Sequence, residues 1–221
     1  TQGTKIGLFE GKLASYVGTK YAAAVNSGTA ALELAVRAAG VGKGSSVITT
    51  PFSFVATANA VVFNQGSVEF VDIDRETFNI DPGRVEEKIT EKTRAIVPVH
   101  FAGQCCDMNE LMEIASKHGL EVVEDASHAL GGEFNGKKAG SFGSSGCFSF
   151  HAVKHITAGE GGAITTNSED SYNKLLLLRN HGIDKSASER FGPNAGYMYD
   201  VKELSRNFRA TDIWCALAVS Q

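Results

Sequence analysis

Short runs of apolar and β-branched residues alternate with helix-like segments along most of this chain, and that alternation most constrains its fold. The helix-like segments carry their own start signals. Asp81-Pro82 combines an N-cap side chain with proline at the first helical position, and Asp107 with Glu110 fits a capping box before a helix ending at His118-Gly119. Strands that alternate with helices predict an α/β fold whose mainly parallel, mixed sheet is flanked by helices. The other predicted helices cover residues 8–17, 30–39, 53–63, 169–180 and 211–221, and the predicted strands cover residues 21–25, 47–50, 68–73, 95–100, 121–125, 146–151 and 161–166.

Composition excludes several classes of function. The net charge of -4 and the pI of about 5.9 argue against a nucleic-acid partner, because neutralising phosphates requires clustered Lys and Arg. No apolar run approaches the ~20 residues that span a bilayer, and Thr1 to Phe9 do not read as a signal peptide. The four cysteines lack CxxC spacing, so we expect no metal site, reduced thiols and a cytoplasmic protein.

Polar residues follow three of the predicted strands. They are the segments Asn26-Ser27-Gly28-Thr29, Asp125-Ala126-Ser127-His128 and His151-Ala152-Val153-Lys154. Ligands of open α/β sheets bind at the carboxyl ends of the strands. We therefore expect these segments to meet at one site.

The first two segments each allow a functional and a structural interpretation. Gly28 between Ser27 and Thr29 would let backbone N–H groups approach a phosphate at a helix start, or Ser27 could simply cap that helix. Asp125 ends a buried strand, where a carboxylate needs a partner. A protonated heterocyclic nitrogen and an internal salt bridge would both serve, and His128 could share that environment or be structural.

The stretch FSFHAVKHITAGEGGA, residues 148–163, is the most informative. Lys154 follows an apolar strand and precedes a Gly-rich loop that lacks the P-loop and Rossmann spacings. In a partly desolvated, electropositive pocket this lysine would release its proton more readily and become an amine nucleophile. An exposed loop lysine is the structural alternative.

Six motifs occur in order along the chain: NSGTAAL, PFSFVATANAV, VEDASHALGG, FSFHAVKHITAGEGGAITTN, LRNHGI and NFRATDI. Together they resemble the sugar aminotransferases of the DegT/DnrJ/EryC1/StrS family, which are fold-type I pyridoxal-phosphate enzymes. The resemblance covers essentially the whole chain, and VHFAGQCCDM, FHAVKHITAGEGG and LRNHGI look closest to its flagellin-sugar branch. It implies a cytoplasmic enzyme with pyridoxal 5'-phosphate as cofactor.

The resemblance implies a role for each matched residue around the cofactor ring. Lys154 matches the lysine that forms the Schiff base, and Asp125 matches the acid that keeps the pyridine nitrogen protonated. His128 matches a position near the ring and its phenolic oxygen, and Phe54 matches the aromatic side chain that stacks on the ring.

The phosphate end has its own matches. Gly28, Thr29 and Ser149 match the phosphate cup, and Asn207 matches an asparagine that reaches the phosphate of the neighbouring subunit. Ser205 stands where the family usually has glycine, which departs from the pattern beside Asn207. A homodimer with shared active sites is therefore implied.

The resemblance also implies a reaction, transfer of an amino group from glutamate to a nucleotide-linked keto-sugar. The flagellin-sugar branch aminates C4 of a UDP-4-keto-6-deoxy-N-acetylhexosamine; C3 amination and dTDP-sugars are alternatives. Relatives that dehydrate a sugar at C3 have histidine where this chain has Lys154, although His155 is adjacent. A non-catalytic homologue is a further alternative, since we expect residues 1–221 to be the cofactor-binding large domain without the smaller C-terminal domain.

Overall fold

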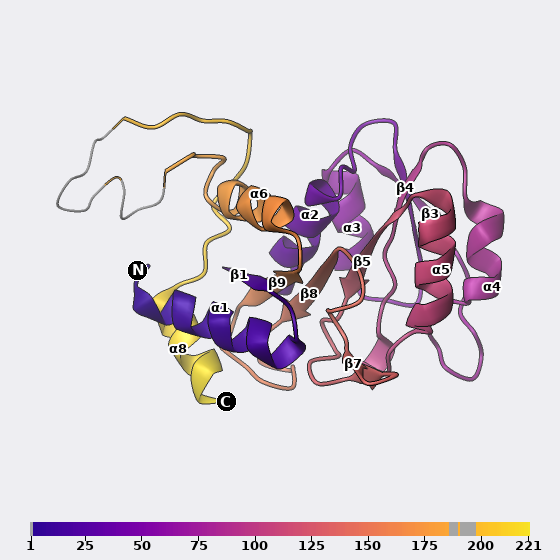
Figure 1. The fold of residues 1–221 in the computed structure, drawn as a ribbon, viewed down its shortest axis with the longest axis horizontal. Coiled ribbons are helices and arrows are strands. Elements are labelled where there is room, and N and C mark those ends of the chain that lie inside the picture. Colours follow the sequence, from indigo (N-terminus) through magenta and orange to yellow (C-terminus); the bar gives the residue numbers. More distant parts are fainter. Residues whose placement is uncertain (1, 186–189, 191–197) are drawn as a thin grey trace.

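The computed structural model describes residues 2–185, 190 and 198–221, and its centre is a sheet with helices on both faces (Figure 1). In this part of the chain the sheet has seven strands in the order β1-β9-β8-β5-β4-β2-β3. The pairs from β8 to β3 are parallel, whereas β9 runs antiparallel to both β8 and β1. The predicted α/β class and mainly parallel, mixed sheet are confirmed. The strands are β1 (Tyr21–Val25), β2 (Ser46–Thr49), β3 (Ser67–Phe70), β4 (Thr93–Ile96), β5 (Glu121–Asp125), β8 (Ser145–Ser149) and β9 (Gly162–Thr166), and β6 (Glu133–Phe134) and β7 (Lys137–Lys138) form a separate hairpin.

The helices form two outer layers. Helices α2, α3 and α6 pack on one face of the sheet; on the other face α1 and α8 cover the β1 end while α4 and α5 cover the β4 side. Alternate residues of a strand enter different layers: Ala23 and Val25 face α2, whereas Ala22 and Ala24 face α1. Burial on both faces explains the continuous apolar runs. The helices are α1 (Thr4–Val17), α2 (Gly28–Ala38), α3 (Ala56–Phe63), α4 (Pro82–Val85), α5 (Met108–His118), α6 (Glu169–Arg179) and α8 (Asp212–Ser220), with 3-10 turns at Glu86–Lys88 and Phe101–Gly103.

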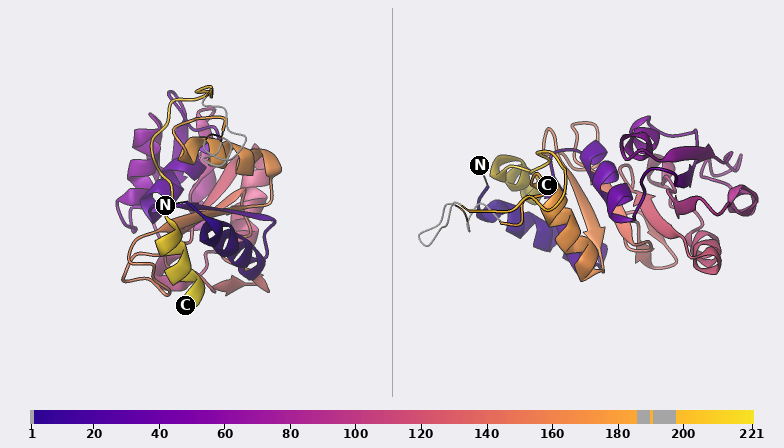
Figure 2. Two further views of the ribbon diagram at one scale, coloured as in Figure 1. Left: turned by 90° about the vertical axis from the view of Figure 1, so that its left-hand side faces the viewer. Right: turned by 90° about the horizontal axis from the view of Figure 1, so that it is seen from above.

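Helices α1 and α8, from the two ends of the chain, pack side by side at one end of the molecule (Figure 2). Asp212 lies at the start of α8 and accepts a hydrogen bond from the Ile6 N–H at 3.2 Å. Phe9 of α1 meets Phe150 edge-on, with ring centroids 5.2 Å apart. The first residues of the chain are therefore anchored by the last ones.

The predicted caps are present where the sequence placed them. Asp81 accepts from the Gly83 N–H, and Asp107 accepts from the Glu110 N–H. Gly119 ends α5 in the left-handed conformation at φ 64°, which glycine adopts without strain.

Several predicted boundaries differ from the structure. Helix α1 starts at Thr4 instead of residue 8, and α3 starts at Ala56 instead of residue 53. The strand predicted over residues 95–100 ends at Ile96, because Pro98 has no N–H to donate to a ladder. The residues released by the late start of α3 form a loop at the carboxyl edge of the sheet.

Candidate functional site

A pocket of about 500 Å³ lies at the carboxyl edge of the sheet. Segments that follow β1, β2, β4, β5 and β8 line it, so the polar residues predicted to meet do meet. All the predicted site residues except Asn207 line this pocket: Gly28, Thr29, Phe54, Asp125, His128, Ser149 and Lys154.

The N-terminus of α2 forms one wall of the pocket. Ser27 caps this helix, because its Oγ accepts from the Ala30 N–H at 3.1 Å. Within the described residues the N–H groups of Gly28 and Thr29 have no protein acceptor, and both residues face the pocket. The structural cap and the predicted anion site are thus compatible, since a capped helix start still offers free N–H groups to a phosphate.

Close packing makes glycine necessary where the N-terminus of α2 meets β8 and β9. A Cβ on Gly28 would lie 2.7 Å from the Ser149 Cβ, so the helix start and the end of β8 approach more closely than side chains permit. A Cβ on Gly162 would lie 2.2 Å from the Ser27 carbonyl oxygen. This wall of the pocket is therefore assembled from three separate segments: the start of α2, the end of β8 and the start of β9. Ser149 supplies a hydroxyl to it.

Asp125 is the buried acid of the site and is 5% exposed. Its Oδ2 accepts from the Thr57 hydroxyl at 2.7 Å, and its Oδ1 accepts from the Ser127 N–H at 3.2 Å. No ion pair with a Lys or Arg is formed by Asp125 in the described part of the chain, so the salt-bridge alternative is not what the structure shows. Its carboxylate can still accept from a cation that enters the pocket.

Lys154 lies in the turn after β8, where its N–H donates to the His151 carbonyl at 2.9 Å. Burial lowers the pKa of the Lys154 amine, and the negative charge of Asp125 opposes this effect only in part. Burial also lowers the pKa of His128, and the charge of Lys154 lowers it further. The lysine can therefore lose its proton more readily than an exposed lysine, as a nucleophilic amine requires.

Phe54 lies in the loop before α3 and is 71% exposed although it lines the pocket. A large aromatic face left open to solvent beside a buried acid suits a flat heterocycle. Phe101 lines the pocket as well and stacks at a tilt on Phe52, with centroids 4.5 Å apart.

Asn207 lies outside the pocket. Its carbonyl accepts from Asn26 Nδ2 at 3.3 Å, and its side-chain Oδ1 accepts from the Arg209 N–H at 3.2 Å. It is exposed, close to β1, and it does not contribute to the pocket of its own chain.

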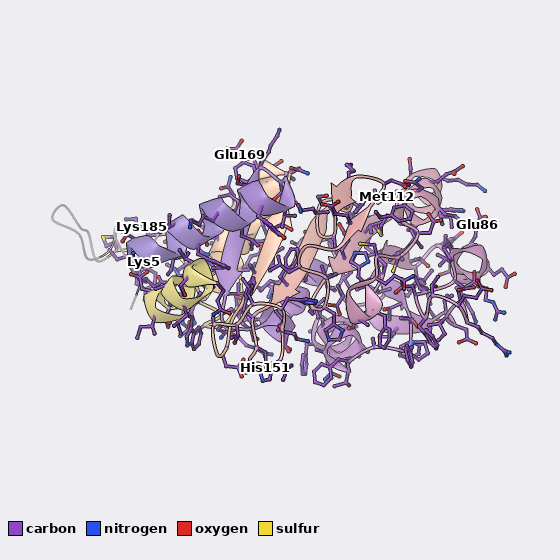
Figure 3. The ribbon with its side chains drawn as sticks, turned by 90° about the horizontal axis from the view of Figure 1, so that it is seen from below. Lys5, Glu86, Met112, His151, Glu169 and Lys185 are labelled. Carbon is purple, nitrogen blue, oxygen red and sulfur yellow. The ribbon has the colours of Figure 1, made fainter. Side chains whose placement is uncertain are left out.

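Sequence reasoning assigned no individual role to Thr57, His151 or Glu160, although His151 belongs to one of the three segments expected at the site. Thr57 stands out in the sequence only as a hydroxyl within an apolar helical run. His151 and Glu160 line the rim of the pocket, where His151 Nε2 lies 3.8 Å from Glu160 Oε1. Figure 3 shows His151 at the outer edge of the molecule. The sequence signal for these two residues was their position: His151 lies close to Lys154, and Glu160 lies in the Gly-rich loop.

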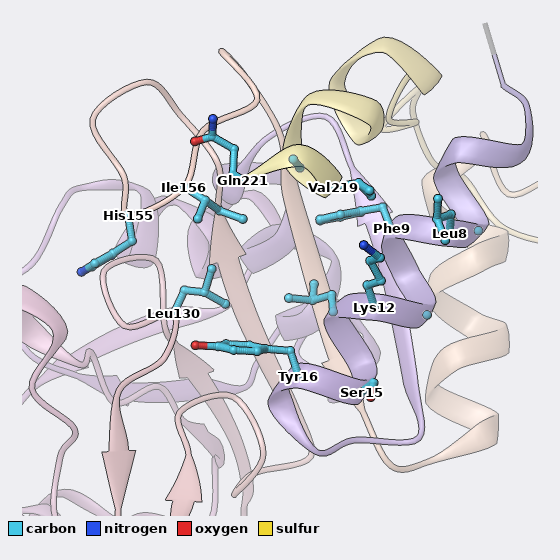
Figure 4. Close-up of a pocket in the computed structure, with 14 residues that line it drawn as sticks. Leu8, Phe9, Lys12, Ser15, Tyr16, Leu130, His155, Ile156, Val219 and Gln221 are labelled. Atoms are coloured by element: carbon cyan, nitrogen blue, oxygen red, sulfur yellow. The ribbon is translucent and has the colours of Figure 1, made fainter.

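A larger hollow of about 810 Å³ lies elsewhere, between α1 and the end of α8 (Figure 4). Leu8 and Tyr16 of α1, Val219 of α8 and Ile156 line it, together with Lys12. Its lining is mostly apolar and includes none of the predicted site residues, although His155 reaches its edge. Size alone therefore does not identify the functional pocket.

In the described part of the chain, no three His, Cys, Asp or Glu side chains are placed to hold a metal ion. No helix there combines the length and the apolar character that a membrane span needs. All four cysteines are free, and Cys147 is fully buried as a core residue.

Comparisons with known proteins agree on one family. The model of the DegT/DnrJ/EryC1/StrS aminotransferase family matches residues 1–221. GDP-perosamine synthase of Caulobacter vibrioides is 43% identical over 96% of this chain and 55% of its own length. UDP-4-amino-4,6-dideoxy-N-acetyl-beta-L-altrosamine transaminase of Campylobacter jejuni is 41% identical over 100% of this chain and 57% of its own length.

A solved structure adds the same fold with the cofactor. Spr1654 of Streptococcus pneumoniae, assigned as a sugar aminotransferase and solved in its PLP form, superposes with a TM-score of 0.91. It is 31% identical, and the match covers 100% of this chain and 59% of that one. The chain thus spans somewhat more than half the length of the proteins it matches.

Proposed function

We propose, since this chain belongs to the DegT/DnrJ/EryC1/StrS aminotransferase family, that its pocket binds pyridoxal 5'-phosphate and serves amino transfer from glutamate to a nucleotide-linked keto-sugar. The observation that carries the proposal is the meeting of a Lys154 amine of lowered pKa with the buried Asp125 carboxylate in one pocket. Aminotransferases of this family use that cofactor, and the donor set here fits it.

Each part of the cofactor has a matching group in the pocket. The free N–H groups of Gly28 and Thr29 and the Ser149 hydroxyl suit the phosphate. Asp125 suits a protonated ring nitrogen, and Phe54 offers a face to the ring.

When bound, the cofactor supplies an electron sink for cleavage of a bond at the substrate carbon. The chain contributes the rest. Lys154 provides the amine that bonds to the cofactor and that can move a proton at the substrate carbon. Asp125 would hold a positive charge at the ring nitrogen, and the lowered pKa of His128 favours its neutral form as a hydrogen-bonding group near the ring.

The finer proposal is C4 amination of a UDP-4-keto-6-deoxy-N-acetylhexosamine. It is supported by the motifs VHFAGQCCDM, FHAVKHITAGEGG and LRNHGI and by the 41% identity to the altrosamine transaminase of C. jejuni. The perosamine synthase of C. vibrioides is as similar, at 43% identity, and its name specifies a GDP-sugar. The test is therefore a screen of UDP-, dTDP- and GDP-4-keto sugars with glutamate, in the protein that carries this sequence.

Product mass and NMR would decide the regiochemistry in that screen. Nitrogen at C4 of a UDP-linked N-acetyl sugar is the expected result. Nitrogen at C3, or turnover of the GDP-sugar alone, would contradict the substrate while leaving the amino transfer intact.

Cofactor attachment has its own test. Pyridoxal phosphate should give a visible absorption band that borohydride abolishes, with the reduced adduct found on the peptide containing Lys154. Lys154→Ala should remove the adduct and the transamination, whereas the matched variant Lys92→Ala, at an exposed turn, should retain both. An adduct on another lysine, or wild-type turnover by Lys154→Ala, would refute the assignment.

For assembly we propose a homodimer with shared active sites and cytoplasmic residence. Asn207 is exposed and outside its own pocket, so its side chain is available to a neighbouring one. Phe54 and Val153 line the pocket and are 71% and 78% exposed, and Val55, next to Phe54 in the chain, is 58% exposed. Such exposure of apolar side chains is typical of a surface that a partner covers.

A further inference from the structure

The Thr57 hydroxyl donates a hydrogen bond of 2.7 Å to Asp125 Oδ2, and both residues are buried, at 1% and 5% exposure. We propose that Thr57 is a positioning residue, which keeps the Asp125 carboxylate aimed at the ring nitrogen of the cofactor. This inference rests on the proposed function, because it assumes that Asp125 faces that nitrogen.

The backbone of Asp125 is fixed independently of its side chain. Its N–H donates to the Pro98 carbonyl at 2.9 Å, and its own carbonyl accepts from the His100 N–H at 3.1 Å. With the backbone held, the remaining freedom of the carboxylate is rotation about its side-chain bonds. The Thr57 hydroxyl and the Ser127 N–H hold one oxygen each and so remove that freedom.

The direction of the Thr57 hydrogen bond follows from its partner. An ionised carboxylate only accepts, so the hydroxyl proton must point at Asp125. A hydrogen bond to a charged group is stronger than one between neutral groups, so this contact holds the carboxylate firmly in place. If Thr57 were absent, Asp125 Oδ2 would lose its donor, and the carboxylate could rotate away from the ring nitrogen.

The placement of Thr57 is not the usual one for a helical threonine. Threonine in a helix commonly donates back to a carbonyl one turn earlier. Thr57 is the second residue of α3 and instead bonds across to the end of β5, 68 positions along the chain. Because the pocket-lining Phe54 lies two residues before the first residue of α3, one helix start carries both the ring-facing aromatic and the support of the acid.

The test compares Thr57→Val, which removes the hydroxyl but keeps the shape, with Thr57→Ser, which keeps the hydroxyl. Thr165→Val is the matched control, since Thr165 is fully buried and its hydroxyl also makes a 2.7 Å bond, but to the Gly140 carbonyl. The probes are pyridoxal phosphate and its 1-deaza analogue, in which C–H replaces the ring nitrogen. Affinities are measured by equilibrium dialysis on apo protein whose folding is checked by circular dichroism.

Thr57→Val should weaken pyridoxal phosphate binding by about tenfold or more, the range for losing a hydrogen bond to a charged group. Binding of the deaza analogue should change by less than about threefold, because this analogue has no ring nitrogen with which the Asp125 carboxylate can pair. Thr57→Ser and Thr165→Val should resemble wild type with both probes. If Thr57→Val does not fold, Thr57→Cys replaces it in the same comparison, because the cysteine thiol is only a weak donor.

Equal losses for both probes, or no loss for either, would overturn the role of Thr57 while leaving the cofactor site intact. Wild-type protein that binds neither probe would instead refute the proposed function itself. A further readout is the split of kinetic constants: a lower kcat at unchanged KM is expected of Thr57→Val, restored by serine.

Discussion

Glu124→Gln is a sharp test of the buried support beneath the site, because Glu124 is 0% exposed and surrounded by donors only. Its Oε1 accepts from the N–H groups of Phe142 and Gly143, both at 2.8 Å. Its Oε2 accepts from the Gly140 N–H at 2.7 Å and lies 3.0 Å from His100 Nε2.

The tautomer of His100 follows from its other ring nitrogen. Nδ1 accepts from the Cys106 N–H at 3.1 Å, so it carries no hydrogen, and Nε2 must carry it and donate to Glu124. Four donors thus meet four lone pairs of one carboxylate.

Glutamine at position 124 would place an NH₂ group where one carboxylate oxygen was. In either orientation of the amide, two of the four donors then face another donor. At about 1–3 kcal/mol for each unsatisfied buried donor, the free energy of unfolding should fall by about 2–6 kcal/mol. For a chain of this size that corresponds to a decrease in Tm of roughly 5–20 °C.

The assay is thermal and urea unfolding followed by circular dichroism. Glu133→Gln is the control, because Glu133 pairs with Lys138 at 3.0 Å on the surface with side-chain exposures of 54% and 28%. That variant should lose less than about 1 kcal/mol. A Glu124→Gln protein as stable as Glu133→Gln would refute the argument that the carboxylate holds the loop of residues 139–143.

Three other predictions concern the site. Burial lowers the pKa of Lys154 and the charge of Asp125 raises it, so Asp125→Asn should lower this pKa further. The pH midpoint for formation of the borohydride-trapped adduct on Lys154 should then move to lower pH, and a shift to higher pH would contradict this. Gly162→Ala should destabilise the protein by about 1–3 kcal/mol and weaken cofactor binding, since its Cβ would meet the Ser27 carbonyl, whereas Gly7→Ala in open space on α1 should not; equal unfolding curves would be the adverse result. Asn207→Ala should weaken cofactor affinity by roughly 5–150-fold and abolish cofactor-linked dimer stabilisation in sedimentation, and a tight-binding monomer indifferent to this change would exclude the shared site.

Local chemistry made much of the candidate site predictable from the sequence. Lys154, Asp125 and Gly28 each lie at or shortly after the end of a predicted strand, and strands that run in the same direction end at the same edge of the sheet. Motif resemblance then supplied the roles of Phe54, His128 and Ser149, which strand periodicity alone does not specify. The structure brings all of them to one pocket.

Thr57, by contrast, was not predictable as part of the site. Its significance depends on a partner 68 positions away, and a hydroxyl in an apolar helix has no local feature that names such a partner. Asn207 was predicted by resemblance, and only the fold shows that it lies beside Asn26 and outside its own pocket.

The sequence by itself determined the elements whose signals lie within a few residues. The Asp107 cap, the Gly119 helix end and the strand Glu121–Asp125 stand where their residues predict them, because the signals of caps and of short buried strands lie within one turn or one strand. Tertiary structure alone decided the strand order, with β9 inserted antiparallel between β1 and β8, and the pairing of His100 with Glu124. These features depend on packing and hydrogen bonds between residues distant along the chain, and no short window of sequence contains both partners.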